Sequence, residues 1–163
     1  MKTNPVNFTI DKENKKISIT REFAAPKPKV WAAWTQSELL EQWWAPKPWK
    51  ARTKTMDFRE GGHWLYAMVG PKGEEHWARA DYTSIKPQDS YTGEDSFCDE
   101  EGNINESMGT STWKNSFSES SDVTVVNMHI SFKRIEDLNG MIEMGFKEGM
   151  LMALDNLEEL LAN

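Results

Sequence analysis

The period of the hydrophobic pattern changes near the carboxyl end of this chain, and this change limits the possible folds more than any other feature. Up to residue 132, apolar residues mostly alternate with polar ones in short runs bounded by turn formers, which is typical of β-strands. Over the residues that follow, the period becomes that of an α-helix. The residues that share one helical stripe are Ile142, Phe146, Gly149, Met150, Ala153, Leu157 and Leu160. Strands followed by one long terminal helix predict an α+β domain whose curved sheet wraps the helix, because both must bury an apolar face.

The strand-like runs predict an antiparallel sheet. A first pair of runs, at residues 6–10 and 17–23, is separated by turn formers and is expected to form a hairpin. Later runs predict a meander of six strands, at residues 53–58, 63–69, 75–85, 91–98, 105–117 and 123–132. We expect about six to seven strands in the one sheet that wraps the terminal helix.

Two short helices are predicted after the first long strand. Pro28 suits the first turn of a helix whose apolar face includes Trp31 and Trp34. Thr35 stands three residues before Glu38, which is the spacing of a capping box, so a second helix is expected to begin there. The two helices therefore interrupt the strands between the hairpin and the meander.

Composition and charge restrict the class of protein. A length of 163 residues suits a single domain spanning residues 1–163, and apolar residues at 38% with charged residues at 28% are typical of a globular chain. The 19 basic and 26 acidic side chains give a net charge of −7, which disfavours nucleic acid as a partner. Because no apolar run suits a signal peptide or a bilayer span, we expect no membrane insertion and a cytoplasmic location.

The side chains that usually carry catalysis or bind metals form no recognisable centre. Cys98 is the only cysteine, and a lone thiol is more often a packed residue than a nucleophile. The three histidines, His63, His76 and His129, fall on different predicted strands without the short spacing of zinc ligands. No serine lies in a nucleophile elbow. The sequence therefore predicts no catalytic residue, no metal and no cofactor.

Tryptophan and methionine are unusually frequent, with eight and nine residues. They would either fill a core or line a cavity. If the turn at residues 70–73 pairs its flanks symmetrically, Trp64 faces Arg79 and Tyr66 faces Trp77 on one side of a hairpin. On the concave side of the sheet these rings would line a cavity, where Arg79 would hold a carboxylate or a phosphate. Alternatively, Arg79 and Trp64 form a cation–π pair that braces the sheet.

Two glycines, Gly145 and Gly149, interrupt the middle of the predicted terminal helix. Glycine inside a helix costs about 1 kcal/mol relative to alanine. This cost is tolerated where another group approaches the helix backbone closely, either the aromatic rings of the sheet or a ligand. Phe146 and Met150 flank the glycines on the side that we expect to face the sheet.

Several segments between residues 17 and 161 resemble a known family. The matching segments are residues 21–26, 39–46 with the pair Trp43 and Trp44, 57–62, 80–82 and 145–161. The chain is similar to bacterial relatives of the carboxy-terminal domain of the heat shock protein 90 ATPase activator, which have the helix-grip fold of the START and birch-pollen-allergen superfamily. The resemblance implies a cavity between the sheet and the long helix. Relatives include lipid or polyketide binders, stress-related co-chaperone modules and a few cyclases.

Three functional hypotheses follow from these patterns and the resemblance. In the first, the chain is a non-catalytic domain that encloses a small hydrophobic molecule, such as a lipid or a polyketide. The residues expected to contact that molecule are Trp44, Trp64, Tyr66, Trp77, Arg79, Met128, Phe146, Gly149 and Met150. In the second, tryptophan nearly fills the cavity and the domain contacts a chaperone such as the heat shock protein 90 homologue. In the third, the chain is a cyclase-like or dehydratase-like enzyme with Arg79, Tyr66 or Asp81 as the acid–base group.

Overall fold

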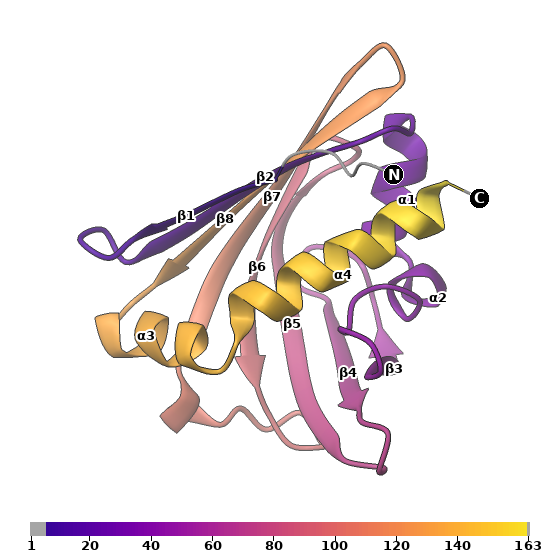
Figure 1. Ribbon diagram of the computed structural model, residues 1–163. Coiled ribbons are helices and arrows are strands. Elements are labelled where there is room, and N and C mark those ends of the chain that lie inside the picture. The colour runs from indigo at the N-terminus through magenta and orange to yellow at the C-terminus, as the bar shows by residue number, and fades with distance from the viewer. Residues whose placement is uncertain (1–5, 163) are drawn as a thin grey trace.

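The computed structural model describes residues 6–162 as one antiparallel sheet with helices on its concave face (Figure 1). Its eight strands follow the order β1-β2-β8-β7-β6-β5-β4-β3. The strands are β1 (Val6–Asp11), β2 (Lys16–Phe23), β3 (Lys50–Met56), β4 (His63–Val69), β5 (Glu75–Lys86), β6 (Ser90–Phe97), β7 (Thr110–Ser120) and β8 (Val123–Phe132). The helices are α1 (Lys27–Thr35), α2 (Ser37–Leu40), the 3₁₀ turn η1 (Glu106–Met108), α3 (Ile135–Glu143) and α4 (Phe146–Leu161).

The predicted α+β architecture, with a curved sheet wrapping a carboxy-terminal helix, is confirmed, and the sheet has one strand more than the upper expectation. The meander of six strands and both strands of the opening hairpin all join the same sheet, because β2 pairs with β8. The strand expected at residues 105–117 begins only at Thr110, since Asn105 starts η1 instead. Its side-chain oxygen accepts a hydrogen bond from the Ser107 backbone nitrogen.

The second short helix starts differently from the prediction. The Thr35 hydroxyl donates to the Trp31 carbonyl at 2.8 Å, so Thr35 belongs to the end of α1 and does not cap the next helix. Gln36 occupies the N-cap position of α2 without a side-chain hydrogen bond, and α2 has only four residues. The predicted capping box is therefore wrong, because a local back-bond within α1 uses the hydroxyl that the box requires.

The register of the β4–β5 hairpin also differs from the prediction. Val69 pairs with Glu75, which leaves a five-residue loop from residue 70 to residue 74. Trp64 consequently pairs with Ala80 and Tyr66 with Ala78, rather than with Arg79 and Trp77. Since a shift of one residue exchanges the two faces of a strand, Trp77 and Arg79 lie on the opposite, convex face of the sheet from Trp64 and Tyr66. The predicted pairs are wrong, and so is the cation–π brace between Arg79 and Trp64.

The terminal helix is not continuous. α3 ends at Glu143, and Gly145 has a φ of 87°, which lies in the left-handed region and forms the N-cap of α4. Gly145 therefore lies in the turn between two helices and not inside one continuous helix. Gly149 does lie inside α4, and a Cβ atom there would lie 3.7 Å from the Pro46 side chain. The close neighbour of this glycine is thus a proline ring beside α4 rather than the aromatic rings of the sheet.

Replacing Gly145 with alanine is expected to lower the free energy of unfolding by about 1 kcal/mol, because a side chain disfavours the left-handed conformation. Gly140 inside α3 is the matched control: apart from its chain neighbours and the adjacent backbone of its own helix, no described atom lies within 4 Å of a Cβ built there. Gly140→Ala should raise the free energy of unfolding by up to about 1 kcal/mol through helix propensity. Urea denaturation of both variants checks the signs, and stabilisation by both would contradict the broken helix.

The hydrophobic core lies between the concave face of the sheet and the helices. It includes fully buried side chains from β2, β8 and α4, such as Ile17, Met128 and Leu157, each with 0% exposure. The side chains of Trp34 and Trp43, both 1% exposed, extend this core between α1 and the turn after α2. The tryptophans of the sequence therefore build much of the core, and the space they leave defines the candidate site.

Candidate functional site

Small residues in the centre of the sheet leave room on its concave face. Ala80 on β5 stands between Trp64 on β4 and Asp95 on β6 in one row of the antiparallel ladder. The next residue of β6 on the same face is Gly93, whose cross-strand partner on β7 is Trp113. Aromatic side chains thus surround a strip of the sheet that has almost no side chains of its own.

The rings around this strip are held in place by hydrogen bonds. The Trp44 indole nitrogen donates to the Tyr66 hydroxyl at 3.0 Å, and the Trp64 indole nitrogen donates to the Thr53 hydroxyl at 3.0 Å. Trp64 and Tyr66 stack with ring centroids 3.8 Å apart and an interplanar angle of 17°. These contacts fix the positions of the rings and satisfy the indole nitrogens of Trp44 and Trp64.

The space that remains among these side chains is narrow. The cavity lined by Trp34, Trp44, Trp64, Tyr82, Asp95 and Trp113, among others, has a volume of about 30 Å³. This is room for a few waters at most, because one water needs roughly 10–15 Å³. In this conformation the tryptophans nearly fill the cavity that they line.

Asp95 places a carboxyl group against this aromatic wall. The residue is half-buried, and no hydrogen bond or ion pair joins its carboxyl to any group in residues 6–162. Burial, together with the charge of Asp81, raises the pKa of Asp95 to about 8. The side chain is therefore mostly protonated at neutral pH in the empty protein.

Three tyrosines lie around this carboxyl. Burial raises the pKa of Tyr66, Tyr82 and Tyr91, and the charge of Asp95 adds to the effect in all three. Their hydroxyl groups consequently stay protonated. Asp95 is therefore the group of this set that changes its charge near neutral pH.

Two further polar atoms along the cavity have no partner within the described chain. They are the indole nitrogen of Trp34, which is 1% exposed, and the side-chain oxygen of Asn115, which is 3% exposed. Leaving a buried donor or acceptor unsatisfied costs about 1–3 kcal/mol. A donor, an acceptor and a carboxyl thus line one small space without satisfying one another, which is characteristic of a site that receives a polar group.

The structure brings most of the sequence-predicted site residues to the concave side. Those that belong to the core or pack against it are Trp44, Trp64, Tyr66, Met128, Phe146 and Met150. Of these, Trp44 and Trp64 line the cavity itself. Phe146, the first residue of α4, contacts Trp113 with ring centroids 6.0 Å apart.

The other predicted contacts, Trp77, Arg79 and Gly149, lie away from the cavity. The Arg79 guanidinium donates to Asp81 at 2.6 and 2.9 Å and to the Gly102 carbonyl at 2.8 Å on the convex face. It cannot hold the head group of a molecule inside the cavity. Trp77 lies beside the Arg52 guanidinium, 5.7 Å from the ring centroid. Asp81, another of the three acid–base candidates, forms an ion pair with Arg79 and likewise lies outside the cavity.

Most residues that line the cavity are not among the predicted site residues, and the three with polar groups that lack a partner, Trp34, Asp95 and Asn115, are all among those missed. For Asp95 a signal existed, because alternation along β6 places it on the same face as Tyr91, Gly93 and Phe97. A carboxylate at an inward position of a strand is unusual unless it is paired. That observation alone singles out Asp95.

The family model described as "Activator of Hsp90 ATPase homolog 1-like protein" matches residues 24–162. The chain belongs to this family. The resemblance found in the sequence is thereby confirmed, and the match extends from the end of β2 through α4, so it includes every element that forms the cavity. No curated protein matches the chain.

Several solved structures of bacterial proteins have the same architecture as this chain. A protein from Arthrobacter aurescens is 31% identical with a TM-score of 0.90, over 96% of this chain and 91% of that one. A Mycobacterium smegmatis protein is 30% identical with a TM-score of 0.88, over 96% and 97% of the two chains. A Staphylococcus epidermidis protein is 30% identical with a TM-score of 0.82, over 94% and 93%.

The described residues offer neither a metal site nor a membrane-spanning helix. Within residues 6–162, no cluster of three or more His, Cys, Asp or Glu side chains has the geometry to bind a metal ion. No helix in the same range is long and apolar enough to cross a membrane.

Proposed function

We propose that the chain is a non-catalytic binding domain that encloses a small, largely apolar molecule between α4 and the concave face of the sheet. The observation that carries this proposal is the pair of buried polar atoms without a partner in the described chain, on Trp34 and Asn115, beside the Asp95 carboxyl inside an aromatic wall. Binding sites for small molecules combine apolar rings with a few polar groups in this way. The helix-grip fold, with one long helix lying across a curved sheet, supplies the enclosure (Figure 1).

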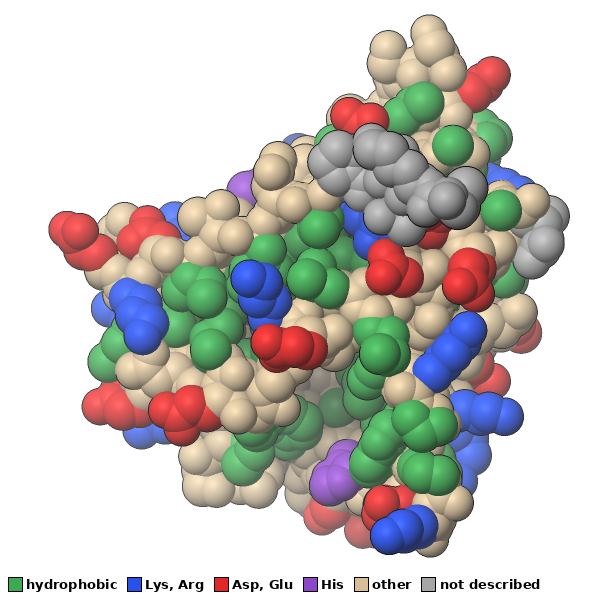
Figure 2. Space-filling model, viewed as in Figure 1, with side chains coloured by type: hydrophobic (Ala, Val, Ile, Leu, Met, Phe, Trp, Pro, Cys, Tyr) green, Lys and Arg blue, Asp and Glu red, His purple; other side chains and the backbone are tan. Residues whose placement is uncertain are grey.

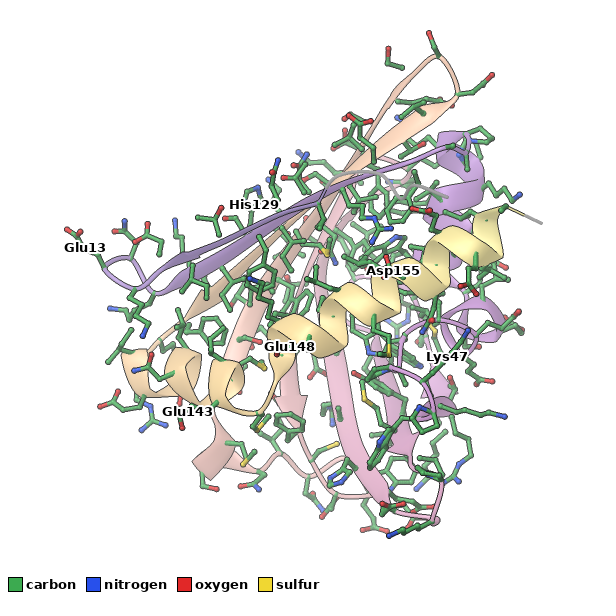
Figure 3. All side chains as sticks on the ribbon, viewed as in Figure 1. Glu13, Lys47, His129, Glu143, Glu148 and Asp155 are labelled. Atoms are coloured by element: carbon green, nitrogen blue, oxygen red, sulfur yellow. The ribbon has the colours of Figure 1, made fainter. Side chains whose placement is uncertain are left out.

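Binding requires the cavity to expand, because sites for drug-sized ligands have volumes of about 300–1,000 Å³. The polar side-chain contacts of α4 are concentrated in its second half, where Asp155, Asn156 and Glu158 bond to β2 or to the turn after α2. In the first half, residues 146–154, the described chain shows no side-chain hydrogen bond or ion pair. Figure 3 labels Glu148 in the first half of α4 and Asp155 in the second.

We infer that the first half of α4, which is held against the sheet by apolar, aromatic and cation–π contacts alone, is the part that moves away from it. It begins at the left-handed Gly145, and Phe146 covers the Trp113 ring there. Figure 2 shows a hollow with apolar side chains around it below this half of the helix. Displacing Phe146 would uncover the Trp113 ring, which lines the cavity, and methionine side chains such as Met150 adapt readily to a new neighbour.

A neutral apolar probe tests the proposal. We expect N-phenyl-1-naphthylamine to bind the purified protein and to quench part of the tryptophan fluorescence, since Trp44, Trp64 and Trp113 line the cavity. Ala80→Leu fills the space between Trp64 and Asp95 and should weaken binding at least about tenfold. Ala162→Leu, an exposed position just after α4, is the control and should bind like the wild type.

Native mass spectrometry of freshly purified protein provides a second measurement, since a retained molecule would appear as added mass. Melting curves of both variants show whether each is folded, so a loss of binding can be assigned to the cavity. Failure of the wild type to bind the probe or to retain any molecule contradicts the proposal. Equal binding by Ala80→Leu would place the site elsewhere.

The small volume of the cavity, about 30 Å³, supports a second candidate function. A core nearly filled by tryptophan suits an interaction module whose outer surface contacts a protein, and the family name refers to activation of the Hsp90 ATPase. If this function is correct, the chain should stimulate the ATPase of a purified bacterial heat shock protein 90 homologue. An unchanged ATPase rate at saturating chain concentration rules this candidate out.

A further inference from the structure

We propose that the molecule held in the cavity carries a protonated amine, which forms an ion pair with Asp95. This inference rests on the proposed function and names the chemistry of its ligand. The carboxyl of Asp95 lines the cavity together with Trp44, Trp64 and Trp113, and no cationic side chain lines it with them. No side chain that lines the cavity therefore supplies the positive charge that an ionised Asp95 needs, and in the proposed complex the ligand supplies it.

The titratable groups around Asp95 favour a cationic ligand, because those that face it in the cavity are neutral. On β4, β5 and β6 the titratable groups that face it are Tyr66, Tyr82 and Tyr91, which remain neutral because burial raises the pKa of each. Through the sheet, Asp81 contributes negative charge, which Arg79 on the convex face partly offsets. The cavity-lining side chains from α1, α2 and β7 do not titrate.

Hydrogen bonding and aromatic contacts favour the same group. An ammonium has only donors, and the unpartnered side-chain oxygen of Asn115 is an acceptor on the cavity wall. Tryptophan faces attract cations, at about 0.5–2 kcal/mol for each contact. The remaining unpartnered group, the Trp34 indole nitrogen, is a donor and would be satisfied by an oxygen of the ligand or by a retained water. The apolar walls select a ligand whose body is hydrocarbon.

Binding of an amine would release a proton. In the empty protein Asp95 has a pKa of about 8 and is mostly protonated at pH 7. The ammonium stabilises the carboxylate, so the carboxyl proton leaves to solvent as the ion pair forms, and no bond other than O–H breaks. Affinity should therefore increase about 50-fold between pH 6 and pH 8, the range over which the ionised fraction of a group with this pKa increases from about 1% to about 50%, and then level off.

A matched pair of probes tests this inference. 1-Naphthylmethylamine carries a primary ammonium below about pH 9, and 1-naphthylmethanol has nearly the same shape without the charge. Isothermal titration calorimetry at pH 6, 7 and 8, in buffers of different ionisation enthalpy, gives affinities and the number of protons released. We expect the amine to bind at least about tenfold more tightly than the alcohol at pH 8. About one proton should leave per amine bound at pH 7.

Two variants on β6 complete the experiment. Asp95→Asn removes the charge and keeps the shape, so it should bind the alcohol like the wild type while losing both the preference for the amine and its pH dependence. Glu94→Gln, the exposed neighbour on the convex face, is the control and should change neither. Binding of the alcohol with no preference for the amine overturns this inference and leaves the proposed function standing. Binding of neither probe overturns both.

Discussion

Asp95→Asn is expected to stabilise the empty protein at pH 7 by about 2–4 kcal/mol. The folded protein holds the Asp95 proton up to a pKa of about 8, whereas the unfolded chain releases it near the ordinary value of about 3.9. Between these values the folded state binds the extra proton, so stability falls as pH rises, by at most about 1.4 kcal/mol per pH unit. Asparagine carries no charge and avoids this loss. Because the half-buried carboxyl contacts solvent, the gain in the free energy of unfolding should be smaller than the full difference in pKa between the folded and unfolded states implies.

Urea denaturation at pH 5, 7 and 8 measures this prediction. The difference between Asp95→Asn and the wild type should be small at pH 5 and increase up to pH 8, where it levels off. Other titrating groups are common to both proteins and cancel in the difference. Glu94→Gln should stay within about 0.5 kcal/mol of the wild type at every pH, because its carboxylate is exposed. An Asp95→Asn variant less stable than the wild type at pH 8 would contradict the assigned protonation.

A stability gain on removing a carboxylate bears on function as well. Residues that cost a protein stability are common at sites where binding or catalysis needs them. The cost here is shared among Asp95, the Asn115 oxygen and the Trp34 nitrogen, all on the same cavity. Combined with loss of the preference for the amine over the alcohol in the same variant, the gain would show that Asp95 serves the ligand and not the fold.

The face on which each residue of β5 lies shows where sequence reasoning succeeds and where it fails. Alternation over residues 75–85 predicts the strand itself, but the turn before it predicts the wrong register. The glycines at positions 70 and 73 suggested a four-residue loop, and Glu74 also belongs to that loop. A better guide was the strand's own pattern, since Arg79 and Asp81 form its polar face and Ala80 and Tyr82 its apolar face.

The terminal helix shows a similar ambiguity. Residues 142 and 146 are four apart, so the apolar stripe appears continuous across a break that lies between them. Gly145 was the available signal, because glycine just after a helix commonly adopts the left-handed conformation that ends it. Periodicity cannot distinguish two helices separated by a break from one continuous helix that contains glycines, since both place apolar residues on the same side.

The sequence predicts only part of the site for a related reason. Trp34, Asn115 and Asp95 lie on three different elements, and only the fold brings them together.

Neutralising both carboxylates that bind Arg21 is expected to cost the protein about 3 kcal/mol. The Arg21 side chain is 1% exposed, and its terminal nitrogens contact Asp155 at 2.8 Å and Glu158 at 2.6 Å on α4. In the double variant that combines Asp155→Asn with Glu158→Gln, the amide oxygens still accept the hydrogen bonds of Arg21. The buried guanidinium, however, loses its negative counter-charges. Glu159→Gln, whose ion pair with Lys47 is exposed at both ends, is the control on the same helix and should cost less than about 0.5 kcal/mol.

A third substitution separates charge from packing in this anchor of α4. Arg21→Met in the double-variant background removes the unpaired cation and keeps an apolar chain of similar length, so it should restore most of the lost free energy of unfolding in urea titrations. No recovery would assign the loss to packing instead. The anchor joins β2 to the second half of α4, so weakening it should loosen the end of the helix that the proposed opening keeps fixed. In the double variant, under conditions where it remains folded, Ala80→Leu should then no longer weaken probe binding, because the helix no longer closes over one defined space.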